Sequence, residues 1–225
     1  MSTPSINTSL EIYQTMSESE STRRDFPDWE NLYKSQSVET MPWYNERFDS
    51  DLERELDQRK IIANGKKFLD LGTGPATQAI WLVKRGFSVI GSDLSEAAIN
   101  RARKVYASEK NVNFIADDIV NTKLKSNEFD YIFDRGCFHV LSPRDRKEYI
   151  NKIIRILKDN GILFLKCFSD KEPMEEGPYK FSQGEIRDLF SDSLTIDSIK
   201  ETVYQGTRSP LPKALFAVMI KSGRT

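Results

Sequence analysis

Hydrophobic and polar positions follow a regular pattern between about residues 66 and 221. Short apolar runs of strand length alternate with segments whose apolar residues recur at helical spacing. The apolar runs are residues 66–71, 87–91, 112–116, 129–133, 162–168, 194–204 and 214–221. Such an alternation predicts an α/β fold, with a mainly parallel sheet of about seven strands and helices on both faces. The last two runs have no clear helix between them, so we expect an antiparallel hairpin at one edge.

Local signals mark where several of the helices begin and end. Ser95 can cap a helix that runs to about Tyr106, and Pro143 stands at the first position of another. The apolar stripe of that second helix continues to a stop at Asn160-Gly161. Capping-box spacing of Ser182 and Glu185 predicts a short helix before the final hairpin. Helical spacing also covers residues 51–62 and 77–85.

The N-terminal part of the chain has a different texture. Residues 1–27 are rich in Ser, Thr and Glu, and we interpret them as a flexible extension. Residues 28–225 form a single predicted domain, which begins with an aromatic-rich lead-in at residues 28–64. These aromatic residues either pack against the main core or form a lid over a ligand.

Composition narrows the class of protein. A chain of 225 residues with 38% hydrophobic residues fits one large domain. Lys plus Arg number 33 and Asp plus Glu 34, so no basic excess points to nucleic acid. The two cysteines show no metal-ligand spacing, and we expect neither a metal nor a disulfide framework. No apolar run is long enough to span a membrane, so we expect a cytoplasmic protein. We also expect a monomer or a weak dimer.

A glycine-rich turn follows the first predicted strand and carries the candidate chemistry. It contains Asp70, Gly72, Thr73 and Gly74, and a helix follows it. Asp93 ends the next predicted strand, nineteen positions after Gly74, which is close to the spacing expected for a carboxylate that binds a ribose. This combination predicts a site for a nucleoside cofactor.

The turn also distinguishes between cofactors. A pyrophosphate usually needs a third glycine three residues after the second, where this chain has Thr77. Pro75 removes one backbone donor, and Asp70 would repel a pyrophosphate. The same carboxylate suits the positively charged sulfonium and ammonium groups of S-adenosylmethionine. We therefore expect S-adenosylmethionine rather than NAD.

Three motifs and one longer region resemble known families. The segments FLDLGTG (68–74), VIGSDLS (89–95) and FIADDI (114–119) look like the successive cofactor motifs of class I methyltransferases. Residues 129–190, with an Asp-Arg-Gly turn, a Pro-x-Asp-Arg helix start and a Gly-Pro loop, are similar to the thiopurine methyltransferase family and its bacterial small-molecule relatives. The resemblance implies the Rossmann-like methyltransferase fold.

The resemblance also implies roles for single residues. The glycine turn would line the methionine end of the cofactor, Asp93 its ribose, and Leu94 its adenine. Asp118, with the amide of Ile119, would meet the adenine edge, unless Asp117 takes that role. The remaining expected cofactor-site residues are Trp43, Asp134 and Arg135, the last two where methyl donor and acceptor meet.

Two residues are candidates for catalysis. Arg135 could hold an anionic acceptor or brace its loop through a carboxylate. His139, the one histidine of the chain, could act as a general base or could be a hydrogen-bonded bystander. This chain has Cys137-Phe138-His139 where family members carry small apolar residues, so thiopurine is not an assured substrate.

We therefore predict a methyltransferase that acts on a small-molecule nucleophile, first of all a thiol or another soft acceptor. A protein-lysine methyltransferase and a catalytically silent S-adenosylmethionine-binding module are the alternatives. Amino-group methylation of bases usually shows an Asn/Asp-Pro-Pro-aromatic turn, which Asp134-Arg135-Gly136-Cys137 does not match.

Overall fold

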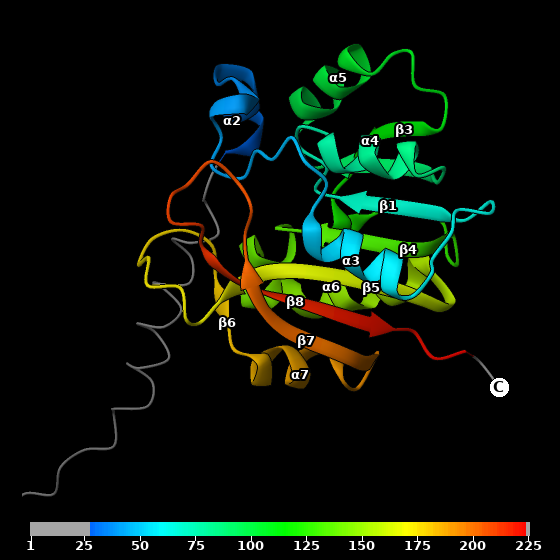
Figure 1. Ribbon diagram of the computed structural model, residues 1–225, viewed down its shortest axis with the longest axis vertical. Coiled ribbons are helices and arrows are strands. Elements are labelled where there is room, and N and C mark those ends of the chain that lie inside the picture. Colours follow the sequence, from blue (N-terminus) through cyan, green and yellow to red (C-terminus); the bar gives the residue numbers. More distant parts are fainter. Residues whose placement is uncertain (1–27, 224–225) are drawn as a thin grey trace, which may run out of the picture.

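The structure is a computed structural model and describes residues 28–223. The extension expected at residues 1–27 lies outside the described residues. Within them, one mixed sheet runs through the molecule in the order β3-β2-β1-β4-β5-β8-β7 (Figure 1). Its strands are β1 (Lys67–Leu71), β2 (Ser88–Asp93), β3 (Val112–Ala116), β4 (Phe129–Arg135), β5 (Leu157–Ser169), β7 (Thr195–Val203) and β8 (Lys213–Ile220).

Strand direction follows the predicted pattern. Strands β1 to β5 pair in parallel, and β8 pairs antiparallel with both β5 and β7. The terminal hairpin therefore forms one edge of the sheet, as predicted. A two-residue strand, β6 (Lys180–Phe181), pairs in parallel with β5 and was not expected. This strand order is the Rossmann-like arrangement that the resemblance implies.

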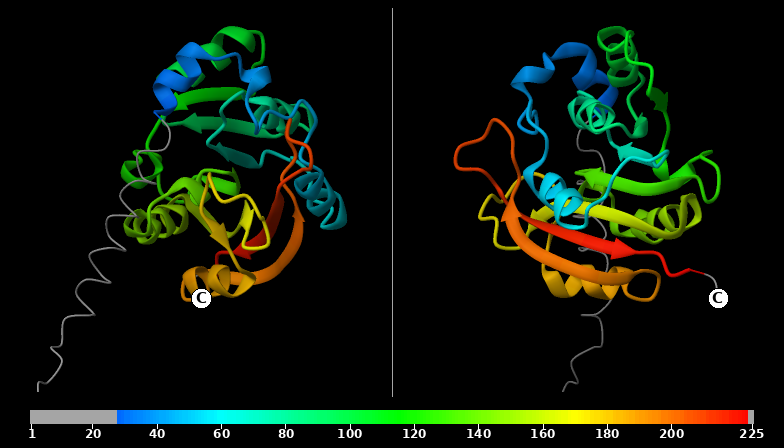
Figure 2. Two further views of the ribbon diagram at one scale, coloured as in Figure 1. Left: turned by 90° about the vertical axis from the view of Figure 1, so that its left-hand side faces the viewer. Right: turned by 45° about the vertical axis from the view of Figure 1, so that its right-hand side comes forward.

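Helices cover both faces of the sheet (Figures 1 and 2). Helices α3 (Ser50–Gln58), α4 (Thr77–Lys84) and α5 (Glu96–Val105) bury their apolar sides on one face, and α6 (Pro143–Ile156) and α7 (Gln183–Phe190) on the other. Neighbouring strand residues alternate between the two cores. Phe68 and Phe164 pack on the α3–α5 side, whereas Leu69 and Leu163 pack on the α6–α7 side.

Two predicted caps are confirmed. The Ser95 side chain accepts the N–H of Ala98 at 3.1 Å at the start of α5. At α7, the Ser182 hydroxyl accepts the N–H of Glu185 at 3.1 Å, and the Glu185 carboxylate accepts the N–H of Ser182 at 2.7 Å. Both helix starts could be predicted because the bonds connect residues only three positions apart.

The predicted end of α6 was wrong. We expected the helix to continue to Asn160-Gly161, but it ends at Ile156 and β5 begins at Leu157. Leu157 pairs with Phe129 of β4, and the register then shifts before Ile162 pairs with Tyr131. Asn160 has a φ of 62° inside this irregular stretch, so the Asn-Gly pair accommodates a bulge rather than ending a helix.

The N-terminal segment continues from α2 (Trp29–Ser35) through the short 3-10 helix η1 (Val38–Thr40) to α3. Helix α2 packs beside α5, where the Glu30 carboxylate accepts bonds from the Ser95 hydroxyl at 2.8 Å and the Ala97 N–H at 3.0 Å. Helix α3 belongs to the core because Leu52 and Leu56 are fully buried. Residues 28–49 thus lie beyond the carboxyl ends of the parallel strands.

Among the described residues, no helix is long and apolar enough to cross a membrane.

Candidate active site

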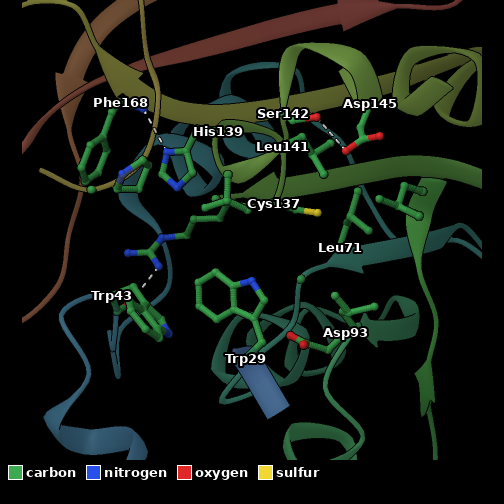
Figure 3. A pocket seen from close by; sticks show the side chains of 18 of the residues that line it. Trp29, Trp43, Leu71, Asp93, Cys137, His139, Leu141, Ser142, Asp145 and Phe168 are labelled. Carbon is green, nitrogen blue, oxygen red and sulfur yellow. Dashed lines mark hydrogen bonds between the residues drawn. The ribbon is translucent and has the colours of Figure 1, made fainter. Parts of the chain in front are cut away.

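A cavity of about 600 Å³ opens where the parallel strands end. The carboxyl ends of such strands are where open α/β sheets bind ligands. Its walls combine strand ends with α2 and with the loops that precede α6, follow β5 and connect β7 to β8. In Figure 3, the Trp29 indole lies between Asp93 and Cys137, and His139 and Phe168 stand at the opposite side from Asp93.

The glycine turn forms the floor at one end. Gly72 and Gly74 have φ values of 69° and 47°, a region that favours glycine. A Cβ on Gly74 would lie 2.5 Å from the Tyr33 hydroxyl, so that aromatic residue closes over the turn. Of the predicted turn residues, only Gly72 lines the cavity, together with Leu71.

Asp70 and Thr73 lie just behind the cavity wall. Both are buried, and the Thr73 hydroxyl donates to the Asp70 carboxylate at 2.6 Å. Burial raises the pKa of Asp70 to about 6. The pair therefore supports the shape of the turn from below.

Asp93 faces the cavity from the end of β2. One carboxylate oxygen accepts the N–H of Gly74 at 2.9 Å, and the other accepts the N–H of Ser95 at 2.9 Å. Burial raises the pKa of Asp93, and the nearby Glu30 carboxylate adds to this rise. Leu94 also lines the cavity, with its side chain 62% exposed. A ligand with hydroxyl donors would stabilise the charged form of Asp93.

The acids after β3 also line the cavity, and they differ in their partners. Asp118 caps the short helix η2 (Ile119–Asn121): it accepts the N–H of Val120 at 3.1 Å and the Asn121 side-chain amide at 2.7 Å. Asp117 accepts the N–H of Lys123 at a long 3.4 Å, and its other carboxylate oxygen is buried with no partner. An orphaned buried oxygen in a cavity wall fits the exocyclic amino group of an adenine.

Asp134 occupies a different position from the one expected. Its carboxylate is fully buried below the turn after β4, where it accepts the N–H groups of Gly136, Cys137 and Phe138 and the Tyr149 hydroxyl at 2.6 Å. Burial raises the pKa of Asp134 to about 6. Asp134 does not line the cavity, and it holds the turn that carries the cavity-lining Cys137.

Arg135 lines the cavity and braces it. Its guanidinium donates to the Asp49 carboxylate at 3.2 Å, to the Trp43 carbonyl at 3.0 Å and to the Gln205 carbonyl, and it lies 4.4 Å from the centre of the Tyr204 ring. Of the two roles considered for Arg135, the structure shows the brace through a carboxylate. One side chain thereby joins the N-terminal segment, β4 and the β7–β8 loop.

Behind Arg135 lies a buried ionic cluster that the sequence did not suggest to us. Lys166 of β5 is 0% exposed and donates to Asp49 at 2.8 Å, Asp51 at 2.7 Å and the Gln205 side chain at 2.5 Å. Burial raises the pKa of Asp51, but the charge and hydrogen bond of Lys166, together with the hydrogen bonds from Thr202 and Arg54, outweigh this and the pKa is lowered overall. The sequence carries a weak sign of this cluster, because Lys166 is a charged residue inside the apolar run 162–168.

Aromatic side chains enclose the end of the cavity opposite the acids. Phe168, Tyr204, Trp43 and Met174 form one apolar cluster there. The sequence analysis predicted none of these residues at this end, since Trp43 was expected among the residues that bind the cofactor. The Trp43 indole N–H donates to the Tyr33 hydroxyl at 3.2 Å, and its ring packs edge-on against Trp29 at 5.5 Å. These contacts join the aromatic end to the segment above the glycine turn.

His139 lies within this aromatic end and is 4% exposed. Its Nδ1 accepts the N–H of Phe168 at 3.2 Å, and its ring packs against Phe168 and Tyr204 with centroid distances of 4.9 and 5.7 Å. Burial, assisted by the charge of Arg135, lowers the pKa of His139 to about 3. The imidazole is therefore neutral near pH 7.

Within residues 28–223, no group of three or more His, Cys, Asp or Glu side chains could hold a metal ion.

The fold and the cavity define an α/β protein with a deep cavity at the carboxyl ends of its parallel strands, beside the glycine turn. A family described as a methyltransferase domain matches residues 68–161. An uncharacterized methyltransferase of Schizosaccharomyces pombe is 33% identical over 134 residues, which are 59% of this chain and 89% of the relative. The chain belongs to the class I S-adenosylmethionine-dependent methyltransferases, and S-adenosylmethionine is its methyl donor.

Further relatives have named acceptors. A 2-heptyl-1-hydroxyquinolin-4(1H)-one methyltransferase of Mycobacteroides abscessus is 29% identical over 181 residues, covering 76% of this chain and 78% of the relative. A thiopurine S-methyltransferase of Legionella pneumophila is 24% identical over 175 residues, covering 70% and 78%. The predicted resemblance to the thiopurine methyltransferases is thus confirmed as a distant relationship.

Solved structures share the fold. A chain from a study of the conversion of a disulfide bond into a thioacetal group during echinomycin biosynthesis superposes with a TM-score of 0.73 at 23% identity, covering 88% of this chain and 93% of that one. The Burkholderia thailandensis 1,6-didemethyltoxoflavin-N1-methyltransferase, solved with 1,6-didemethyltoxoflavin and S-adenosylhomocysteine, has a TM-score of 0.65 at 17% identity, covering 99% and 93%.

Proposed function

We propose that this enzyme methylates a small-molecule nucleophile, and that a thiol or another soft acceptor is its preferred substrate. The observation that carries the proposal is the division of the cavity into an acidic end beside the glycine turn and an aromatic end around His139 and Phe168. The acidic end suits a cationic nucleoside cofactor. The aromatic end suits a flat, apolar acceptor.

At the acidic end we assign Asp93 to the ribose hydroxyls, Gly72 to the methionine part and Leu94 to the adenine face. Asp117 is the better partner for the adenine amino group because one of its oxygens is free, whereas Asp118 caps η2. The amide of Ile119 belongs to the same wall. When bound, S-adenosylmethionine supplies a methyl group on a sulfonium sulfur, which retains the electron pair of the broken bond.

At the aromatic end the enzyme acts by positioning. Trp43, Phe168 and Tyr204 exclude water and orient the acceptor, while Arg135 fixes the segments that carry them. Soft anions are nucleophilic near neutral pH, so such a site needs no strong base. The acceptors for which two relatives are named, a hydroxyquinolinone and a thiopurine, are likewise flat heteroaromatic molecules.

A protein-lysine acceptor fits this end less well. The cavity-lining residues within 135–141, 168–178 and 204–212 include Arg135 and Arg208 but no Asp or Glu. A lysine ammonium there would meet these guanidinium groups. The Asp145 carboxylate, which lines the cavity beyond residue 141, already accepts the Ser142 hydroxyl at 2.8 Å. A mouse EEF1A lysine methyltransferase 2, 26% identical over 163 residues, shows that the wider family includes that activity, and the test below therefore includes an amine.

We further propose that, of the expected lid segment 28–64, the part that precedes α3 acts as a lid, whereas α3 itself belongs to the core. Residues 28–49 supply Trp29, Tyr33 and Trp43 to the cavity wall, and the Glu30 carboxylate fastens α2 to the start of α5. Opening of this segment would admit the cofactor, and closure would bury the reaction.

We also propose a monomer or weak dimer, which sedimentation of the purified protein tests.

The first experiment is calorimetric binding of S-adenosylmethionine and S-adenosylhomocysteine, with NAD as the control. We expect micromolar binding of the first two alone.

The second step is turnover of three matched acceptors, thiophenol, phenol and aniline, together with a lysine-containing peptide. Preferential methylation of thiophenol supports the proposal. Preference for the peptide or the amine overturns it, and cofactor binding without turnover of any acceptor supports a catalytically silent binding module.

A further inference from the structure

The His139 imidazole has one nitrogen engaged and one open. Its Nδ1 accepts the backbone N–H of Phe168 at 3.2 Å. Because a backbone N–H can only donate, Nδ1 carries no proton, and the proton of the neutral ring is on Nε2. No hydrogen bond from Nε2 to a described residue is found, although the side chain is more than nine-tenths buried. Figure 3 shows this second nitrogen turned toward the cavity.

The surroundings fix the ring in this orientation. Phe168 packs edge-on against it, and Tyr204 stacks on it while the Tyr204 hydroxyl donates to the Arg135 carbonyl at 2.7 Å. Gly136 lies so close to the imidazole that a Cβ there would be 3.0 Å from Nε2. The ring cannot flip without breaking the bond to Phe168. A fixed N–H donor therefore points at the place where the aromatic end must hold an acceptor.

The ionisable groups around His139 leave no base at this position. Arg135 is positively charged and has its donors engaged with Asp49 and two carbonyls. Burial raises the pKa of Tyr204 to about 12 and raises the pKa values of Cys137 and Cys167 above the usual thiol value. The Asp134 carboxylate is enclosed by three N–H groups and the Tyr149 hydroxyl below the turn.

We infer that His139 recognises the acceptor as an anion, through a hydrogen bond from Nε2–H to the nucleophilic atom, and that the substrate class is acidic thiols and acidic hydroxyl groups on aromatic rings. This inference rests on the proposed function and specifies its substrate. The acceptor loses its proton to solvent before it binds. The heteroatom of the anion would form a bond to the methyl carbon that the cofactor supplies, while the bond from that carbon to the sulfonium sulfur would break with its electron pair remaining on the neutral thioether sulfur. No proton passes to or from His139.

Two substitutions separate the donor role from the structural role. In His139→Asn the side-chain oxygen can replace Nδ1 as the acceptor for Phe168, but no N–H reaches the cavity. In His139→Gln the longer amide can place an N–H near the position of Nε2. We expect kcat/KM for thiophenol to fall about tenfold or more in His139→Asn, because a hydrogen bond to a charged atom is lost. We expect His139→Gln to recover most of that loss. A similar decrease in both variants would overturn the inference.

The pH dependence provides a second readout. For 4-methoxythiophenol, thiophenol and 4-nitrothiophenol, we expect the rising limb of kcat/KM against pH to move with the pKa of each thiol. A limb that stays at one pH for all three thiols and disappears in His139→Asn would identify His139 as a general base and contradict the inference. The titration of Asp134 is common to the wild type and the variant, so it cancels in their comparison.

A third readout needs no turnover. The absorbance of 4-nitrophenol reports its ionisation, and the complex with S-adenosylhomocysteine cannot transfer a methyl group. We expect binding to the wild type and to His139→Gln to lower the apparent pKa of the probe more than binding to His139→Asn. Equal pKa values in all three proteins, or no probe binding to the wild type, would count against the inference. Loss of S-adenosylhomocysteine binding would instead contradict the proposed function itself.

Discussion

The two ends of the cavity are built in different ways. At the acidic end, Gly72, Asp93 and Asp117 lie in or directly after three neighbouring strands, and their positions follow from the strand–turn–helix order of the chain. At the aromatic end, Trp43, His139, Phe168 and Tyr204 come from four segments that are distant in sequence. The first end is local in construction, and the second depends on long-range contacts.

The contacts that join the aromatic end to the rest of the molecule come from two cations, the largely buried Arg135 and the fully buried Lys166. Arg135 bonds the Trp43 carbonyl across 92 positions of sequence and the Gln205 carbonyl across 70, and Lys166 bonds Asp49 across 117. Burying these charges is costly unless each has a partner. We therefore expect substitutions to separate the two ends: those in the ionic cluster should weaken folding and acceptor use, and those in the strand-end acids should weaken cofactor binding.

The largest effect is expected from Lys166→Met. Removal of the ammonium leaves the buried Asp49 paired with Arg135 alone and the buried Asp51 paired with the partly exposed Arg54, which should lower the free energy of unfolding by about 3–5 kcal/mol. Urea denaturation measures this change. Lys158→Met is the matched control, since Lys158 is 41% exposed and pairs with Asp130 at 2.8 Å. Its effect should stay below about 1 kcal/mol. Equal effects of the two substitutions would remove the distinction between a buried and a surface pair.

Asp93→Ala tests the acidic end. We expect cofactor binding to weaken by about 2–4 kcal/mol, because two ribose hydrogen bonds to a carboxylate are lost at once. Calorimetry with S-adenosylhomocysteine measures the change. Since Asp93 also accepts the N–H groups of Gly74 and Ser95, circular dichroism must first show that the variant is folded. An unchanged affinity in a folded variant would mean that the cofactor site is misplaced.

His139 should make stability depend on pH. Its pKa is lowered from 6.5 to about 3 in the folded protein, so the unfolded chain takes up a proton first as the pH falls. The contribution of the neutral ring is present above about pH 6.5 and is lost as the pH falls toward about 3. At about pH 5 the wild type should have lost about 2 kcal/mol more than His139→Asn, measured by urea denaturation. Because this is the one histidine of the chain, parallel curves for both proteins would contradict the lowered pKa.

The smallest effect distinguishes two adjacent acids. Asp117→Asn should weaken S-adenosylhomocysteine binding by about 1–2 kcal/mol, because the amide offers one acceptor oxygen in place of two. Asp118→Asn should leave the affinity closer to that of the wild type, since Asp118 caps η2. A larger loss of affinity with Asp118→Asn would assign the adenine contact to Asp118. Calorimetry on both variants decides between them.

Sequence patterns predicted much of the fold and part of the site. The strands, the glycine turn and the caps at Ser95 and Ser182 depend on residues a few positions apart, and each was found where expected. The end of α6 was missed because Leu157 fits an apolar helical stripe equally well, and pairing with Phe129 made it a strand residue. Lys166 gave one weak signal, and its partners lie more than a hundred positions away.

The sequence by itself determined the order of strands and helices, the class of cofactor and the position of the carboxylate at Asp93. Hydrophobic periodicity, glycine conformation and capping act over short distances along the chain, so they are visible in a single sequence. The tertiary structure alone decided that Asp134 supports a turn, that Arg135 braces three segments and that His139 keeps its proton on Nε2. Each of these roles depends on which groups are buried together, and burial is a property of the folded chain.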